Sequence, residues 1–113
     1  MVLYDTIISP KALSQLDSYV DYILNTLLNP DAAMNLWRDA EDTRALLAKC
    51  AGSLKLCTHP KLCALGYHPM FFTRHRYVML YRIEDHTAYV DGIYHLLQDY
   101  ENTFARDIDP EST

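Results

Sequence analysis

The sequence contains little glycine and none of the common glycine-based catalytic motifs. Only three of its 113 residues are Gly, and no Gly-rich stretch is present that would cradle a phosphate with backbone N–H groups. Neither Gly-x-Ser-x-Gly nor His-Glu-x-x-His occurs, which are the patterns of serine hydrolases and zinc proteases. Nucleotide hydrolysis and triad esterase chemistry are therefore poorly supported.

Basic charge is also scarce. Lys and Arg together number 10 against 15 for Asp and Glu, which gives a formal net charge of -5 and a pI of about 5.4. Proteins that rely on non-specific phosphate contacts are usually basic. The overall charge therefore counts against a general nucleic-acid binder, although a local basic patch is compatible with it.

Long hydrophobic runs are missing as well. The N-terminal MVLYDTIISPKAL lacks a basic region followed by a long apolar run, and no run approaches the roughly 20 residues of a membrane span. We expect a cytoplasmic protein without a membrane segment. Its cysteines, Cys50, Cys57 and Cys63, are odd in number, which fits reduced thiols better than a disulfide framework.

The hydrophobic content of the chain is sufficient for one folded domain. Half of the residues are hydrophobic and 22% are charged, so the chain can form a core and is not expected to be disordered. We expect a single domain over residues 1–105. The polar stretch 106–113, which contains Pro110, is predicted to be a flexible tail.

The first half predicts a strand followed by two helices. Residues 3–8 suit a short strand. Ser9-Pro10 and Asn29-Pro30 are cap-plus-proline signals, so helices are predicted over 10–28 and 30–50 and would form an antiparallel hairpin. The apolar stripe of the first helix would be Leu13, Leu16, Val20, Ile23 and Leu27, and that of the second Ala33, Leu36, Ala40, Leu47 and Cys50.

The second half predicts three strands and a short helix. Residues 53–64 are interpreted as a connecting loop, with room for one short strand, because Pro60 argues against a regular helix. Strands are predicted over 65–73, 77–84 and 87–95 with strict alternation of faces. A short helix should follow around Leu97 to Phe104. The fold class is α+β in the order β-α-α-β-β-β-α, with the helical hairpin packed on a small antiparallel sheet.

Arg74, Arg76 and Arg82 lie close together in the sequence, beside several histidines and tyrosines. Arg76 and Arg82 are both even-numbered, so one strand would point them to the same face. One interpretation is a basic patch that binds a phosphate backbone or a target. The other is solvated surface charge paired with Glu84, Asp85 or Asp91.

His95 and Tyr100 are the candidates for acid–base chemistry. A histidine at a strand end can take up and release protons near neutral pH, and with Arg82 as a phosphate clamp the set would suit a metal-free ribonuclease. The alternative is a structural histidine whose ring is bonded to the backbone.

A zinc site is a further alternative. Cys50, Cys57, His59 and Cys63 could supply four ligands, but the sequence lacks the close Cys-x2-4-Cys pair of zinc loops. Partly buried reduced thiols explain these residues better, so we expect neither a metal nor another cofactor.

Four segments resemble the RelE/ParE superfamily of bacterial type II toxin–antitoxin toxins. They are YDTIISPKALSQLDSYVDYI, NPDAAMNLW, HRYVMLYRIE and VDGIYHLLQDY, which occur in the family's order and span roughly residues 3–104. The resemblance implies a growth-inhibiting, plasmid-stabilising toxin that a cognate antitoxin neutralises by wrapping around it with a helix and an extended segment.

The resemblance leaves the target open. RelE-like toxins cut mRNA on the ribosome, whereas ParE-like toxins poison DNA gyrase and lack nuclease residues. The positions where nuclease members carry basic residues fall near Val78 and Leu97, both apolar here. We therefore expect a ParE-like toxin, with gyrase or an unassigned target, that acts by binding. A RelE-like ribosome-dependent endoribonuclease, a non-toxic zinc-stabilised domain and a homodimer remain alternatives.

Overall fold

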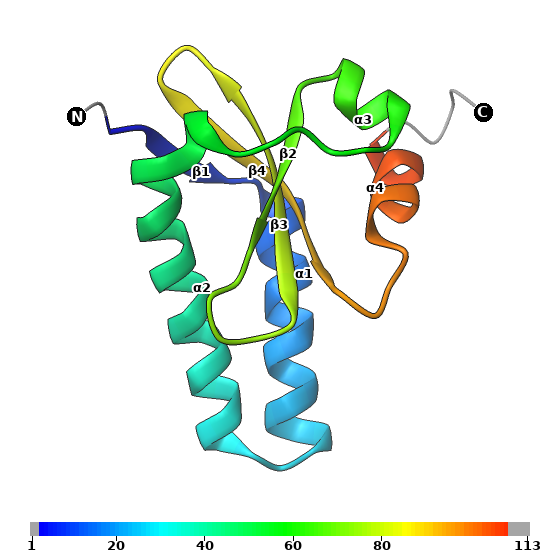
Figure 1. Cartoon of the computed structure of the whole chain (residues 1–113). Helices are drawn as coiled ribbons and strands as arrows, with labels where there is room; N and C mark the ends of the chain where they lie inside the picture. The colour runs from blue at the N-terminus through cyan, green and yellow to red at the C-terminus, as the bar shows by residue number, and fades with distance from the viewer. Residues whose placement is uncertain (1–2, 109–113) are drawn as a thin grey trace.

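A computed structural model describes residues 3–108, and in it a four-stranded sheet has helices on both faces (Figure 1). The predicted α+β class and order of the main elements are confirmed. The elements are β1 (Asp5–Ile8), α1 (Pro10–Asp21), the π-helix η1 (Tyr22–Thr26), α2 (Pro30–Cys50), the 3₁₀-helix η2 (Ala51–Ser53), α3 (Pro60–Ala64), β2 (Tyr67–Phe71), β3 (Tyr77–Glu84), β4 (Thr87–His95) and α4 (Tyr100–Ile108).

The two long helices begin where the sequence predicts. The side chain of Ser9 accepts a hydrogen bond from the N–H of Ala12, and Pro10 occupies the first turn. Asn29 does the same for the N–H of Ala32 at the start of α2. Each cap satisfies a backbone donor that the helix cannot satisfy itself.

The sheet has the strand order β1-β4-β3-β2. The pairs β2–β3 and β3–β4 are antiparallel, as predicted. β1 pairs with β4 in parallel, so the complete sheet is mixed and its first strand is an edge strand. This pairing joins chain segments about 80 residues apart, and local sequence patterns do not carry such information.

A β-bulge corrects the predicted alternation in β4. Leu80 faces Gly92 but the next residue, Tyr81, faces Val90, so Asp91 is the extra residue of β4. A bulge of one residue inverts the inside–outside pattern beyond it. Val90 and Ile93 therefore pack in the same core cluster, although strict alternation assigns them to opposite faces.

The two faces of the sheet bury separate cores. The helical hairpin covers the face of Met79 and Tyr81, whereas α3 and α4 cover the face of Val78 and Leu80. Val78, Met79, Leu80 and Tyr81 are all fully buried. β3 is thus the central strand of the protein, as its apolar character on both faces indicates.

Residues 53–64 differ from the prediction, because the segment contains η2's last residue and the short helix α3. Pro60 does not prevent this helix because it occupies the first turn, where a missing N–H leaves no hydrogen bond unmade. Nδ1 of His59 caps the helix by accepting from the N–H of Lys61 at 3.2 Å. At the C-terminus, Arg106–Ile108 belong to α4, and the rest of the predicted tail lies outside the described residues.

The apolar stripe predicted for the first helix is only partly buried, and the helical hairpin extends past the end of the sheet in Figure 1. Leu16, Val20 and Ile23 pack in the core, but Leu13 and Leu27 of the predicted stripe are exposed. Leu27 follows η1, near the tip where the sheet no longer covers the hairpin. Among the described residues, no helix is both long enough and apolar enough to cross a membrane.

Candidate functional site

The predicted acid–base histidine lies at the end of the sheet where β3 begins and β4 ends. His95 is the cross-strand partner of Tyr77, and their rings meet edge to face with centroids 4.8 Å apart. The preceding β2–β3 loop, residues 72–76, reaches the same end. There the N–H of Leu96 donates to the carbonyl of Arg76 at 2.9 Å, so the loop and the last residues of β4 are held side by side.

The ring of His95 has a defined role in this backbone. Its Nδ1 accepts a hydrogen bond from the N–H of Leu97 at 3.0 Å, which places the proton of the neutral ring on Nε2. The backbone N–H of His95 donates to Oε1 of Gln98, and the hydroxyl of Tyr19 lies 3.0 Å from the same oxygen. The half-buried imidazole therefore helps to form the turn after β4.

Tyr100 opens α4 and packs its ring edge to face on Phe71, with centroids 6.5 Å apart. Burial raises the pKa of its phenol, and the nearby carboxylate of Glu101 raises it further. A raised pKa keeps the phenol protonated at neutral pH and makes it a weaker acid. Its environment is thus the reverse of what fast proton donation needs.

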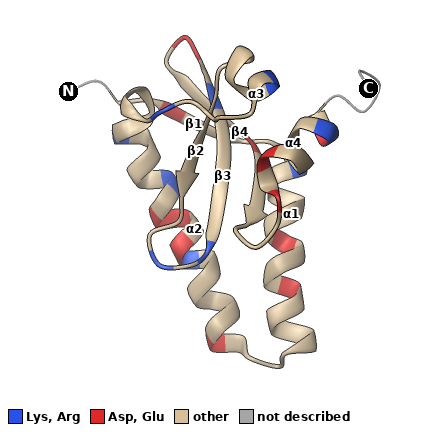
Figure 2. Cartoon of the chain, turned by 45° about the vertical axis from the view of Figure 1, so that its right-hand side comes forward, with Lys and Arg blue, Asp and Glu red and all other residues tan. Residues whose placement is uncertain are grey.

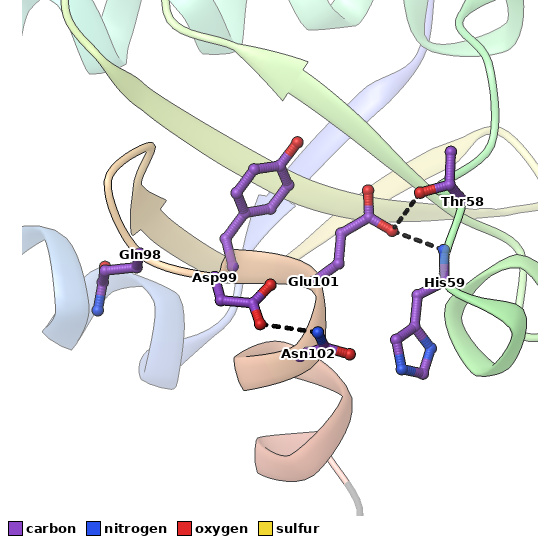
Figure 3. Close-up of a pocket in the computed structure, with 7 residues that line it drawn as sticks. Thr58, His59, Gln98, Asp99, Glu101 and Asn102 are labelled. Carbon is purple, nitrogen blue, oxygen red and sulfur yellow. Dashed lines mark hydrogen bonds between the residues drawn. The ribbon is translucent and has the colours of Figure 1, made fainter.

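The pocket that Tyr100 lines is acidic. Figure 3 shows this open pocket of about 360 Å³, lined by Thr58, His59, Gln98, Asp99, Tyr100, Glu101 and Asn102. Oε1 of Glu101 accepts hydrogen bonds from the hydroxyl of Thr58 and the N–H of His59, and Asp99 accepts from Asn102. With two carboxylates and no Lys or Arg in its lining, the pocket is unsuited to a phosphate. His95 is not among the lining residues.

The structure does not gather the three predicted arginines. Arg74 forms an exposed ion pair with Asp42 at 2.6 Å. Arg82 lies six residues beyond Arg76 along the same chain direction, which corresponds to roughly 20 Å of strand. Among the described residues, Arg76 is exposed and has no ion pair. It is therefore the arginine available to a partner beside His95.

Arg82 belongs to a separate network at the far end of β3. Its Nη1 donates to Glu84 at 2.6 Å, its Nε donates to Asp91 at 3.2 Å, and its guanidinium lies over the ring of Tyr89. The hydroxyl of Tyr67 also donates to Asp91, and burial together with that carboxylate raises the pKa of Tyr67 to about 12. This arginine stabilises the bulge residue and does not face the His95 end.

Asp39 is the residue that sequence reasoning missed. It lies on α2 with no exposed surface, and its carboxylate accepts from the hydroxyl of Thr73 at 2.6 Å, the N–H of Arg74 at 3.0 Å and Nδ1 of His75 at 2.7 Å. Thr43, one turn along the helix, is a weaker partner at 3.5 Å. The signal in the sequence was an aspartate on the apolar stripe, at three-residue spacing from Leu36.

The protonation of Asp39 follows from these contacts. Burial raises the pKa of the carboxyl, but the hydrogen bonds from Thr73, His75 and Arg74 outweigh it and leave the pKa below its usual value. A lowered pKa means that the contacts stabilise the fold above the pKa of the unfolded chain. They are lost only as the pH falls through the lowered value.

The structure offers no ligand set for the zinc alternative. Within residues 3–108, no three His, Cys, Asp or Glu side chains form a group that could hold a metal ion. Cys57 is buried, and burial raises its pKa to about 12, with Glu101 adding to the effect. Cys57 therefore fits the buried, reduced thiol that the sequence favours over a zinc ligand.

No protein-family model and no curated protein matches this chain. Its structure is similar to a chain of a solved structure described as "Chromosomal ParDE TA system from P. aeruginosa". The TM-score is 0.69 at 17% identity, over 85% of this chain and 99% of that chain. At this identity the likeness shows the fold alone, and the shared fold agrees with the α+β class and element order that the sequence predicts.

The contrast between Arg82 and Arg76 gives a testable prediction. Arg82→Ala should lower the free energy of unfolding by about 1–3 kcal/mol, because it removes two hydrogen bonds and leaves Asp91 without its cation. Arg76→Ala should change it by less than about 0.5 kcal/mol. Urea unfolding followed by circular dichroism measures both. If both variants lose the same stability, Arg82 is not the structural arginine and Arg76 is not merely an exposed one.

Proposed function

We propose that this chain is the toxin of a type II toxin–antitoxin system, which inhibits growth in the cytoplasm and is neutralised by a cognate antitoxin. The observation that carries the proposal is the structural likeness to a chain of the P. aeruginosa ParDE system over nearly that chain's whole length. The four sequence segments that resemble the RelE/ParE superfamily support it independently of the structure.

Binding of a target, rather than cleavage of RNA, is the mode of action that the site favours. A metal-free ribonuclease needs a base, an acid and a phosphate clamp around one scissile bond. Here the ring of His95 caps a turn, the pKa of Tyr100 is raised, and Arg82 is bound to two carboxylates at the other end of the sheet. A ParE-like target such as gyrase, or one not yet assigned, fits this better than mRNA.

The proposed contact surface lies around the β2–β3 loop. Arg76 supplies a cation that has no ion pair within residues 3–108, and Phe71 and Leu97 are exposed to 49% and 82%. Figure 2 shows the basic residues of this loop beside acidic residues of α2. An arginine together with exposed apolar side chains is a composition typical of protein-binding surfaces.

The growth of bacteria tests the toxin assignment. Induction of the chain alone should arrest growth, and co-induction of the product of the neighbouring gene should restore it. Normal growth with the folded chain present at high level would refute the assignment.

The helical hairpin offers a surface for the antitoxin. An apolar groove of about 340 Å³ between η1 and α2 is lined by Val20, Leu24, Pro30, Ala33, Met34 and Trp37. The adjoining surface shares Val20 and Leu24 with this groove and adds Asp17 and Asp21. A groove between two helices fits a third, amphipathic helix.

The charge of the helical hairpin indicates which kind of helix would bind in the groove. Between Lys11 and Arg38 the sequence contains Asp17, Asp21 and Asp31 but no Lys, Arg or His, and the far end of the hairpin is accordingly red without blue in Figure 2. Two copies of this chain would repel each other through such a face. An antitoxin helix with an apolar side flanked by Lys or Arg is complementary to it.

Substitutions in the groove should separate toxicity from neutralisation. Met34→Asp should weaken antitoxin binding at least tenfold, since a carboxylate buried without a partner costs on the order of 2 kcal/mol or more. The same variant should still arrest growth. Calorimetry with the purified neighbouring gene product measures the affinity, and Leu65→Asp, an exposed position away from the hairpin, is the matched control. An unchanged affinity of Met34→Asp would exclude the groove.

One observation keeps the endoribonuclease as a second candidate: His95 and the exposed Arg76 lie at the same end of the sheet. His95→Asn decides between the two, because Oδ1 of Asn can replace Nδ1 as the acceptor for Leu97 while the titratable ring is removed. Our proposal predicts undiminished growth arrest. Loss of a general acid–base would instead reduce activity by roughly 10²–10⁴, so a folded but harmless variant would favour the nuclease.

A further inference from the structure

The carboxylate of Asp39 is buried on α2 and contacts three consecutive residues of the β2–β3 loop. Thr73 contributes its hydroxyl, Arg74 its backbone N–H and His75 its ring Nδ1. A buried carboxylate costs free energy unless its oxygens are satisfied. All of the short contacts, up to 3.0 Å, come from this loop, so the loop and the carboxylate depend on each other.

The other side of the loop is fixed by backbone hydrogen bonds. The N–H of Phe72 donates to the carbonyl of Tyr77, and the N–H of Tyr77 donates to the carbonyl of His75. The carbonyl of Arg76 accepts from Leu96 after β4. The loop is therefore attached to α2 through Asp39 and to the end of β4 through Arg76, and these two attachments define its position.

This arrangement fixes the backbone that carries the side chain of Arg76. The residue comes directly after the three that Asp39 binds, and its own side chain has no ion pair among the described residues. A long side chain on a free loop would lose much conformational entropy on binding, whereas a fixed backbone reduces that loss.

We propose that Asp39 is the positioning residue of the target-contact surface, which fixes Thr73, Arg74 and His75 so that Arg76 is presented beside the end of β4. The inference rests on the proposed function, because it names how that surface is held. Asp39 itself does not touch the target, since it has no exposed surface.

Asp42 provides the matched control on the same helix. It pairs with the same loop through the guanidinium of Arg74, but both side chains of that pair are more than half exposed. Exposed pairs contribute little to holding a chain segment in place. Asp39→Asn and Asp42→Asn therefore make the same chemical change, one in a buried anchor and one in a surface pair.

Amide hydrogen exchange measures the anchoring directly. Asp39→Asn removes the negative charge and leaves one acceptor oxygen in place of the two that hold Thr73, Arg74 and His75, so the loop should be held less firmly. We expect exchange at Arg74, Tyr77 and Leu96 to become at least about tenfold faster, with the core of β3 unchanged. Asp42→Asn should leave these rates within about twofold of wild type. Wild-type protection in Asp39→Asn would overturn the inference.

Growth arrest measures the consequence for function. Asp39→Asn should arrest growth at least tenfold less effectively in a titration of inducer, while it still binds the neighbouring gene product. Tyr67→Phe, which loses a hydrogen bond to Asp91 at the other end of the sheet, is the control for lowered stability and should arrest growth like wild type. Full activity of Asp39→Asn would overturn the positioning role. Equal loss in Tyr67→Phe would overturn it too, because stability alone would then explain the effect.

A second variant and the behaviour of the wild type distinguish failure of this inference from failure of the proposed function. If Asp39→Asn does not fold, Thr73→Val removes a single donor, and the same faster exchange and weaker arrest are expected; wild-type behaviour of this variant would overturn the inference. If the wild-type chain does not arrest growth at all, the proposed function fails, and the positioning role fails with it. An active wild type together with an active, folded Asp39→Asn refutes the inference alone.

Discussion

The burial of β3 on both faces is the constraint on which the rest of the structure depends. Val78 to Tyr81 are fully buried between the helical hairpin on one side and α3 with α4 on the other. A strand covered in this way offers no side chain to a ligand along its middle. Functional groups can therefore emerge only at its ends, and the two ends of β3 differ in character.

At one end, charge is neutralised within the molecule, and at the other it is left available. Arg82 is surrounded by Glu84, Asp91 and the ring of Tyr89, and it supports the bulge that lets β4 serve two cores. Arg76 leaves the strand at the opposite end on a loop that Asp39 ties to α2. A structural arginine thus lies near one end of β3 and an exposed arginine lies in the loop at the other end, where we propose that the target binds.

The sequence was sufficient for most of the fold, because the relevant signals are local. Caps and prolines placed the starts of α1 and α2, and alternation placed β3 and β4. The parallel pairing of β1 with β4 and the bulge at Asp91 depend on contacts between distant segments, so local patterns could not reveal them. Pro60 was misread because a proline that breaks a helix inside it is well tolerated in its first turn.

The site was less predictable for the same reason. The odd–even pattern along a strand predicts which face a side chain takes, and on that basis Arg76 and Arg82 were grouped. Six residues of strand already separate them by roughly 20 Å, which the grouping left out. The odd–even pattern also does not reveal which carboxylates from neighbouring strands or helices pair with these arginines. Asp39 was readable as a polar residue on an apolar stripe, but its partners Thr73 to His75 are more than 30 residues away. An aspartate on the buried face of a helix needs hydrogen-bond donors, and this requirement indicated that Asp39 would be bound by another segment.

We propose that the protein stops growth by binding a target and not by cutting RNA. Mapping of RNA 5′ ends in bacteria shortly after induction of the wild-type chain is the decisive measurement. We expect growth arrest with the same 5′ ends as in uninduced cells. New ends inside translated codons, appearing before growth stops, would contradict it.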